Sequence, residues 1–387
     1  MTETVPDRPP FDDEDASRAG AYLALSGRTS FDPLAPENAN GDLIMTTSLA
    51  DARLMMAESF VTRNAAGQPF RVFPLFVERS SPDAFAIDLG DLQLCGVNIG
   101  LVSAVYELSL FVFSQAGLFQ DVGDAASERS PTLPHDAALT FWISDRMQAG
   151  EGAQGTPVGV ELVPRDQQRQ VGALFLTLLM LRFVWLHELF HCLSGHTGYR
   201  AQRQGETALH KVTDGATLSL VEVEATGPTS SIGDGYCMEF DADRSAFWAM
   251  MQRQVNGEEP IDGLRALPAL LRLRLTAFAA VLMTFLFDQA ARRRRAAGGS
   301  HPVAYDRLHN LVRTLASNVS GSDEQLRLLF AHTVVEMDQF QGCVPQAVSG
   351  SQLVRDLRSP ELQGEFDRME EALLSARLQF TRSAFRH

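Results

Sequence analysis

The strongest constraint on the fold is a long apolar stretch that leads directly into polar side chains able to bind a metal. Residues 171–186 read "VGALFLTLLMLRFVWL", and "HELFHCLSGHTG" follows at once. This pattern predicts one long buried helix from about Gln167 to Gly195. Because burying unpaired polar groups costs several kcal/mol, His187, Glu188 and His191 must have partners there.

The spacing of these three residues indicates metal chemistry. Residues four apart lie on one face of a helix, so His187 and His191 can bind the same ion. Glu188 can then act as general base on a water molecule. In the pattern H-E-x-x-H-x-x-G-x-x-H the third histidine comes six residues after the second, whereas His196 comes five after His191. A role beside the ligands, or in packing, is therefore expected for His196.

A carboxylate from a later helix is the alternative third ligand. The segment "EFDADRSA" (239–246) lies in a predicted helix over 236–255. Glu239 and Asp243 are four apart, so one can bind the metal while the other orients a ligand histidine. Asp241 should point elsewhere, into solvent. The residues alone also allow a charged surface helix with Arg244 as counter-ion.

The ordered motifs resemble a known group of peptidases. "HELFHCLSGH" and "EFDADR" are similar to the gluzincin superfamily that includes the HtpX and CAAX-prenyl-protease peptidases, whose pattern is H-E-x-x-H-x-x-x-x-H followed by E-x-x-A-D. His196 occupies the extra histidine of that pattern. "DAFAIDLGDLQLCGVNIGLV" (83–102) is similar to the hairpin and helix that precede the zinc helix in the family, although Asp83 replaces the usual Asn. "SHPVAYDRLHNL" (300–311) is similar to its H-P-x-x-x-x-R element. Lit-type phage-exclusion peptidases are a looser resemblance.

The resemblance implies an α+β, predominantly helical fold with a zincin-like metallopeptidase core, a small β-hairpin or sheet and a pair of zinc-binding helices. It implies a Zn²⁺-dependent endopeptidase acting on protein or peptide substrates, which could pair with an edge strand of the hairpin. A zinc-retaining sensor or interaction protein and a membrane-associated quality-control protease are the alternatives, and the oligomeric state is left open. The resemblance implies that His187, His191 and Glu239 bind the metal and that Glu188 is the general base. It implies that Asp243 orients a ligand histidine and that His196 has a supporting position. His301 and Arg307 would stabilise the oxyanion, or His301 would occupy the fourth zinc position. The simpler interpretation of the last two is an ordinary loop histidine and a surface arginine.

Charge and composition restrict partners and location. The 387 residues include 48 acidic and 33 basic side chains, a formal charge of -15 that disfavours nucleic acid as partner. Four separated cysteines without a C-x-x-C pair are typical of a reduced, cytoplasmic protein. The apolar runs 171–186 and 275–287 favour buried core helices, because a spanning helix needs about 20 apolar residues. "ARRRR" (291–295) after the second run leaves a peripheral membrane contact open.

The predicted organisation is a single metallopeptidase domain over 21–387. Residues 1–20 are interpreted as a disordered acidic leader. Residues 118–166 are interpreted as a loop-rich insertion, and the part from about 303 as helical. Helices are predicted over 48–67 and 100–117, and strands over 70–78, 83–89 and 92–99. Gly90 and Asp91 predict a tight turn that joins the last two strands in a hairpin.

Overall fold

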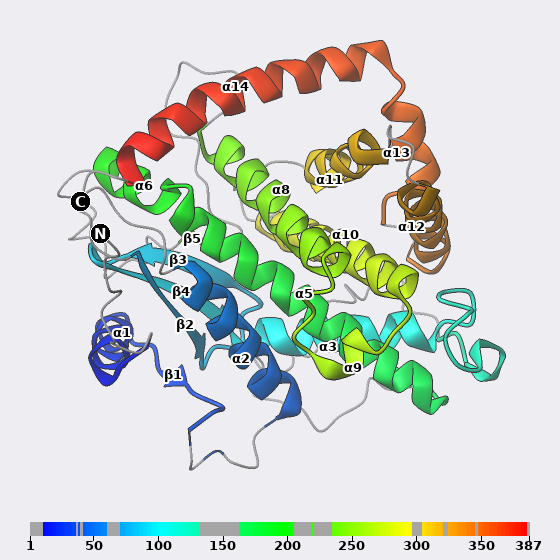
Figure 1. Cartoon of the computed structure of the whole chain (residues 1–387), viewed down its shortest axis with the longest axis horizontal. Coiled ribbons are helices and arrows are strands. Elements are labelled where there is room, and N and C mark those ends of the chain that lie inside the picture. The colour runs from blue at the N-terminus through cyan, green and yellow to red at the C-terminus, as the bar shows by residue number, and fades with distance from the viewer. Residues whose placement is uncertain are drawn as a thin grey trace.

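The protein has an α+β fold in which helices predominate, as a computed structural model shows (Figure 1). A small sheet lies at one end, and α5 (Gln167–Leu193) runs from the sheet through the middle of the helical part. The structure describes residues 11–35, 38, 42–59, 70–131, 162–204, 218–219, 234–295, 304–319, 324–344 and 347–384.

The sheet has five strands in the order β1-β2-β4-β3-β5. The first four are β1 (Ser30–Phe31), β2 (Arg71–Val77), β3 (Ala84–Asp88) and β4 (Leu92–Asn98). β2 and β4 are parallel, whereas β3 and β4 form the predicted antiparallel hairpin. Gly90 has a φ of +90° in the connecting turn, a conformation that glycine adopts without steric cost.

β5 (Leu218–Ser219) pairs antiparallel with β3 at Ala86 and Phe85. This pairing changes one expectation, because the hairpin was predicted to offer an open edge strand to an extended peptide. The chain itself occupies that edge at these two residues.

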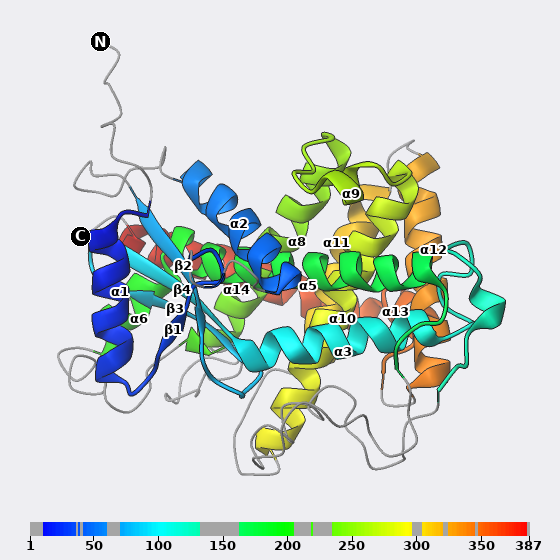
Figure 2. The same ribbon diagram turned by 90° about the horizontal axis from the view of Figure 1, so that it is seen from below.

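Helices cover both faces of the sheet (Figure 2). Side chains alternate between the faces of a strand, and here both sets are buried. On one face Ala19 and Leu23 of α1 (Asp13–Leu25) pack against Phe73 and Leu75 of β2. On the other face α2 (Leu43–Glu58), α3 (Ile99–Ser114) and α5 join the main core.

Helix α1 changes the interpretation of residues 1–20 as a disordered leader. Residues 1–10 lie outside the described part, but the chain is helical from Asp13. Asp12 caps the helix by accepting a hydrogen bond from the backbone N–H of Asp15. The acidic residues that suggested disorder lie in the first turn, where negative charge stabilises a helix.

The remaining helices form the larger, helical part of the molecule. The predicted helix 48–67 begins earlier, as α2, and residues 60–69 lie outside the described part. The others are α6 (His196–Gln204), α8 (Asp234–Val255), α9 (Asp262–Arg265), α10 (Ala269–Arg295), α11 (Ala304–Val319), α12 (Glu324–Cys343), α13 (Gly350–Asp356) and α14 (Pro360–Ala384).

Two described helices, α5 and α10 over its residues 269–287, are long and apolar enough to cross a membrane. In this structure most of each helix is buried inside the protein. A core helix of a globular protein has the same length and composition, so these properties alone do not place the chain in a membrane.

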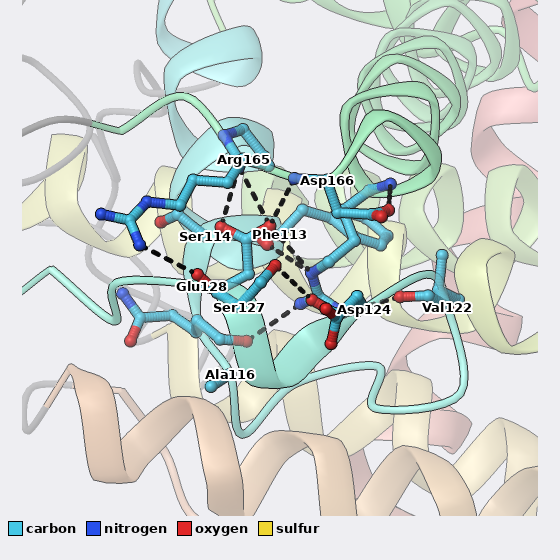
Figure 3. A network of polar contacts seen from close by, with 12 residues as sticks. Phe113, Ser114, Ala116, Val122, Asp124, Ser127, Glu128, Arg165 and Asp166 are labelled. Carbon is cyan, nitrogen blue, oxygen red and sulfur yellow. Dashed lines mark hydrogen bonds and ion pairs between the residues drawn. The ribbon is translucent and has the colours of Figure 1, made fainter.

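A buried arginine organises the start of α5. Arg169 is fully buried, and its guanidinium donates hydrogen bonds of 2.8–2.9 Å to five backbone carbonyls. These belong to Phe113, Gln115, Leu118, Phe119 and Val122. The Glu128 carboxylate accepts from the backbone N–H groups of Arg165 and Asp166 just before the helix (Figure 3). The described part of the predicted insertion is thus a tightly bonded loop with one short 3-10 helix, η3 (Ala125–Ser127); residues 132–161 lie outside the described part.

Replacing Arg169 with methionine is expected to lower the free energy of unfolding by at least about 3 kcal/mol. Five carbonyls would lose this donor; those of Gln115 and Phe119 would keep a backbone N–H donor, and each buried group left unsatisfied costs about 1–3 kcal/mol. Denaturant unfolding measures the change. Arg165→Ala is the control from the same loop, because Arg165 is exposed, and it should change stability by less than about 0.5 kcal/mol. A small effect of Arg169→Met would show that water replaces the lost donors.

Candidate metal centre

His187 and His191 face each other across one turn of α5. Their Nε2 atoms are 2.9 Å apart, and both side chains are buried. The helix thus places two imidazole nitrogens at one point in the protein interior, as the sequence spacing predicted.

The third member of the group comes from α8, which packs against α5. Glu239 Oε2 lies 3.4 Å from His187 Nε2, and Oε1 lies 3.6 Å from His191 Nε2. One ligand atom from each residue lies within 4.8 Å of the others, and this is the only such group found among the described residues.

The chemistry of this group fits a metal cation. Within the described part of the chain, both oxygens of the buried Glu239 carboxylate lack a hydrogen-bond donor, an arrangement that is costly unless a cation is close. Arg307 supplies part of that charge, with Nη2 3.4 Å from Oε2. Burial tends to raise the pKa of Glu239, but His187, His191 and Arg307 outweigh it and hold the pKa at about 2. Glu239 is therefore an anionic ligand at neutral pH.

Asp243 orients His187 from the side away from Glu239. Its Oδ1 lies 2.9 Å from His187 Nδ1, which leaves Nε2 directed at the ligand group. Arg307 of α11 donates to both Asp243 oxygens at 2.6 Å. Arg307 is buried and holds Asp243 in place, so it is not a surface arginine. His301 lies outside the described residues.

Asp241 does not point into solvent, contrary to the sequence-based expectation. It is buried, its Oδ2 lies 3.3 Å from His196 Nε2, and its Oδ1 accepts from Arg377 of α14. α8 is therefore not a charged surface helix, and Arg244 pairs with Glu370 of α14 instead. The physical reason is that α5 and α14 pack against α8, and that His196 of α6 and Arg377 of α14 lie against Asp241.

His196 lies beside His191 and outside the ligand group. Gly195 has a φ of +79°, so the chain turns between α5 and α6 instead of continuing the helix. This turn brings His196 Nδ1 to 2.9 Å from His191 Nδ1.

Glu188 differs from its neighbours in having no counter-charge at hydrogen-bonding distance among the described residues. The side chain is fully buried, and neither oxygen has a hydrogen-bond partner in that part of the chain. Burial raises the pKa of Glu188 well above its usual value, and the nearby Glu239 and Asp83 carboxylates add to this rise, against His187 and Arg307. A carboxyl group with a raised pKa can accept and return a proton near neutral pH.

Zinc affinity is expected to rise by up to about tenfold per pH unit from pH 6.5 to 8.5. Burial lowers the pKa of His187, but Asp243 and Glu239 outweigh it and raise the pKa to about 9. Below that pH the metal must displace a proton from His187, which weakens its apparent affinity. Competition with a chelator at several pH values measures the slope. Asp243→Asn removes one stabilising charge and should flatten it; a flat profile in the wild type would contradict the assigned role of His187.

No family model, curated protein or solved structure matches the chain. The family resemblance of the short motifs is therefore a hypothesis about this chain.

Two features near the site were not predicted from the sequence, namely the burial of Asp241 and its contact with Arg377. Arg377 lies 136 residues after Asp241, and no local pattern links the two. Asp241 did carry a signal, since its flanking residues Phe240 and Ala242 are apolar, but that signal does not reveal its partner.

Proposed function

We propose that this protein is a zinc-dependent endopeptidase with a zincin-like core. The observation that carries the proposal is the group of His187, His191 and Glu239 on two packed helices, with the buried Glu188 adjacent to His187 in the chain. Two imidazole nitrogens and one carboxylate match the ligand set of catalytic zinc sites.

When bound, zinc supplies Lewis-acid chemistry that polarises the scissile carbonyl and lowers the pKa of the attacking water. His187, His191 and Glu239 hold the ion. Glu188 takes a proton from the attacking water and returns it to the departing amine. Burial raises the pKa of Glu188, which makes its carboxylate a stronger base toward the water proton. Asp243, braced by Arg307, keeps His187 Nδ1 occupied so that Nε2 stays free for the metal.

A second candidate is a metal-binding protein whose output is a conformational change or partner binding. Two observations favour it: the ligand side chains are all buried, and β5 occupies part of the β3 edge. Glu188 favours the peptidase, because a buried carboxyl with no hydrogen-bond partner among the described residues costs stability and has no use in a purely structural site.

Peptide cleavage tests the two candidates against each other. Zinc-loaded protein is incubated with an unfolded protein and with a proteome-derived peptide library, and new N-termini are mapped by mass spectrometry. The peptidase predicts new N-termini that disappear with a chelator and with Glu188→Gln. Zinc binding with no new N-termini on either substrate would contradict it and support the second candidate.

A further inference from the structure

A chain of four side chains runs from His191 to the C-terminal helix. His191 Nδ1 is 2.9 Å from His196 Nδ1, and His196 Nε2 is 3.3 Å from Asp241 Oδ2. Arg377 Nε donates to Asp241 Oδ1 at 2.7 Å, and Nη2 donates to the same oxygen. His191, His196 and Asp241 are buried, whereas the Arg377 side chain is 40% exposed. The series therefore begins at the candidate ligands and ends near the surface.

If His191 binds a metal through Nε2, only one assignment of protons to the ring nitrogens of His191 and His196 is possible. A ligand nitrogen carries no proton, so His191 Nδ1 is the protonated atom and donates to His196 Nδ1. His196 must then be protonated at Nε2, which faces the Asp241 carboxylate. Asp241 is an acceptor throughout, and the positive Arg377 keeps it ionised. Metal-bound His191 on one side and Asp241 on the other thus fix the tautomer of His196.

Apolar contacts dock α14 beside this series. Leu373 and Ala376 pack with Tyr199 of α6 and with Cys237 and Met238 of α8. Figure 1 shows α14 crossing the ends of α6 and α8. Arg377 follows Ala376 directly, so the docking of α14 determines whether the guanidinium reaches Asp241.

We infer that α14 is a working part of the metal centre, in which Arg377 positions Asp241 and, through His196, holds His191 with Nε2 facing the ligand group. The inference rests on the proposed metal site. It assigns Arg377, Asp241 and His196 as positioning residues, none of which touches the metal or the substrate. His187 and His191 would then each be oriented by their own carboxylate and arginine, Asp243 with Arg307 for one and Asp241 with Arg377 for the other.

Zinc affinity of Arg377 variants, measured by competition with a chromogenic chelator, is the first test. Arg377→Ala should weaken binding by about 10–100-fold, the usual effect of losing a group that orients a ligand. Arg377→Lys should recover part of this, because it restores the charge without the planar fork. Arg244→Ala is the matched control: it removes another α8–α14 ion pair, with Glu370, but no member of the series. The zinc affinity of Arg244→Ala should stay within about threefold of that of the wild type.

Histidine tautomers give a readout that packing alone would not change. In protein labelled with ¹⁵N-histidine, long-range ¹H–¹⁵N spectra should show wild-type His196 protonated only at Nε2, and a mixture in Arg377→Ala. Unchanged zinc affinity and an unchanged His196 tautomer in Arg377→Ala would overturn the inference, as would equal losses in Arg244→Ala. If Arg377→Ala does not fold, the same two measurements are made on Arg377→Lys. A wild-type zinc affinity together with a wild-type His196 tautomer in that variant would overturn the inference.

Neither measurement uses cleavage. A protein that binds zinc but cleaves nothing would refute the proposed peptidase and leave the inference standing. A wild type that binds no zinc would refute both, whereas Arg377→Ala with wild-type zinc affinity and an unchanged His196 tautomer would refute the inference alone.

Discussion

Glu188→Gln is expected to lower peptide hydrolysis by at least about 100-fold while leaving the zinc content unchanged. Glutamine has nearly the same shape but cannot accept a proton, and loss of a general base typically costs 10²–10⁴-fold in rate. Because neither oxygen of Glu188 has a hydrogen-bond partner among the described residues, the substitution removes no structural bond. The fold and the ligand group should therefore persist.

The measurement is initial cleavage rate on one peptide from the library, with zinc per chain determined on the same samples. Glu258→Gln is a suitable control, because it makes the same chemical change on an exposed residue. It should keep the wild-type rate. Cleavage by Glu188→Gln at more than about a tenth of the wild-type rate would show that another group accepts the proton.

Alanine at any of the three proposed ligands is expected to abolish zinc binding at micromolar concentrations. The wild type should carry about one zinc per chain, because catalytic sites use three protein ligands. Removing one leaves two, and in His187→Ala or His191→Ala it also leaves the Glu239 carboxylate with less compensating charge. Metal analysis after dialysis measures the stoichiometry, and circular dichroism shows whether each variant is folded.

Two controls separate ligand loss from a general effect of the substitution. His332→Ala removes a histidine from α12, and Glu258→Ala removes an exposed carboxylate; both should keep about one zinc per chain. Asp241→Ala does not serve as a control, because Asp241 is buried beside His196. If Glu239→Ala kept its zinc while Asp243→Ala lost it, the assignment of ligand and orienting carboxylate would have to be exchanged.

Short-range patterns in the sequence predicted the parts of the site that lie within single helices. The positions of His187 and His191 follow from the 3.6-residue period of one helix, and the pairing of Glu239 with Asp243 follows from the same period. The β3–β4 hairpin followed from Gly90 and Asp91, because a two-residue turn restricts its own backbone conformation. In each case the residues that determine the feature lie within a few positions of one another in the sequence.

The sequence alone determined that two histidines share one helix face and that two carboxylates share another. Only the tertiary structure decided which carboxylate oxygens lie near His187 and His191, that β5 covers part of the β3 edge, and that α14 brings Arg377 to Asp241. Helix periodicity repeats the same face whatever lies opposite it, so it cannot specify a neighbour. That choice depends on how α5, α6, α8 and α14 pack, which is decided by the burial of apolar surface along the whole chain.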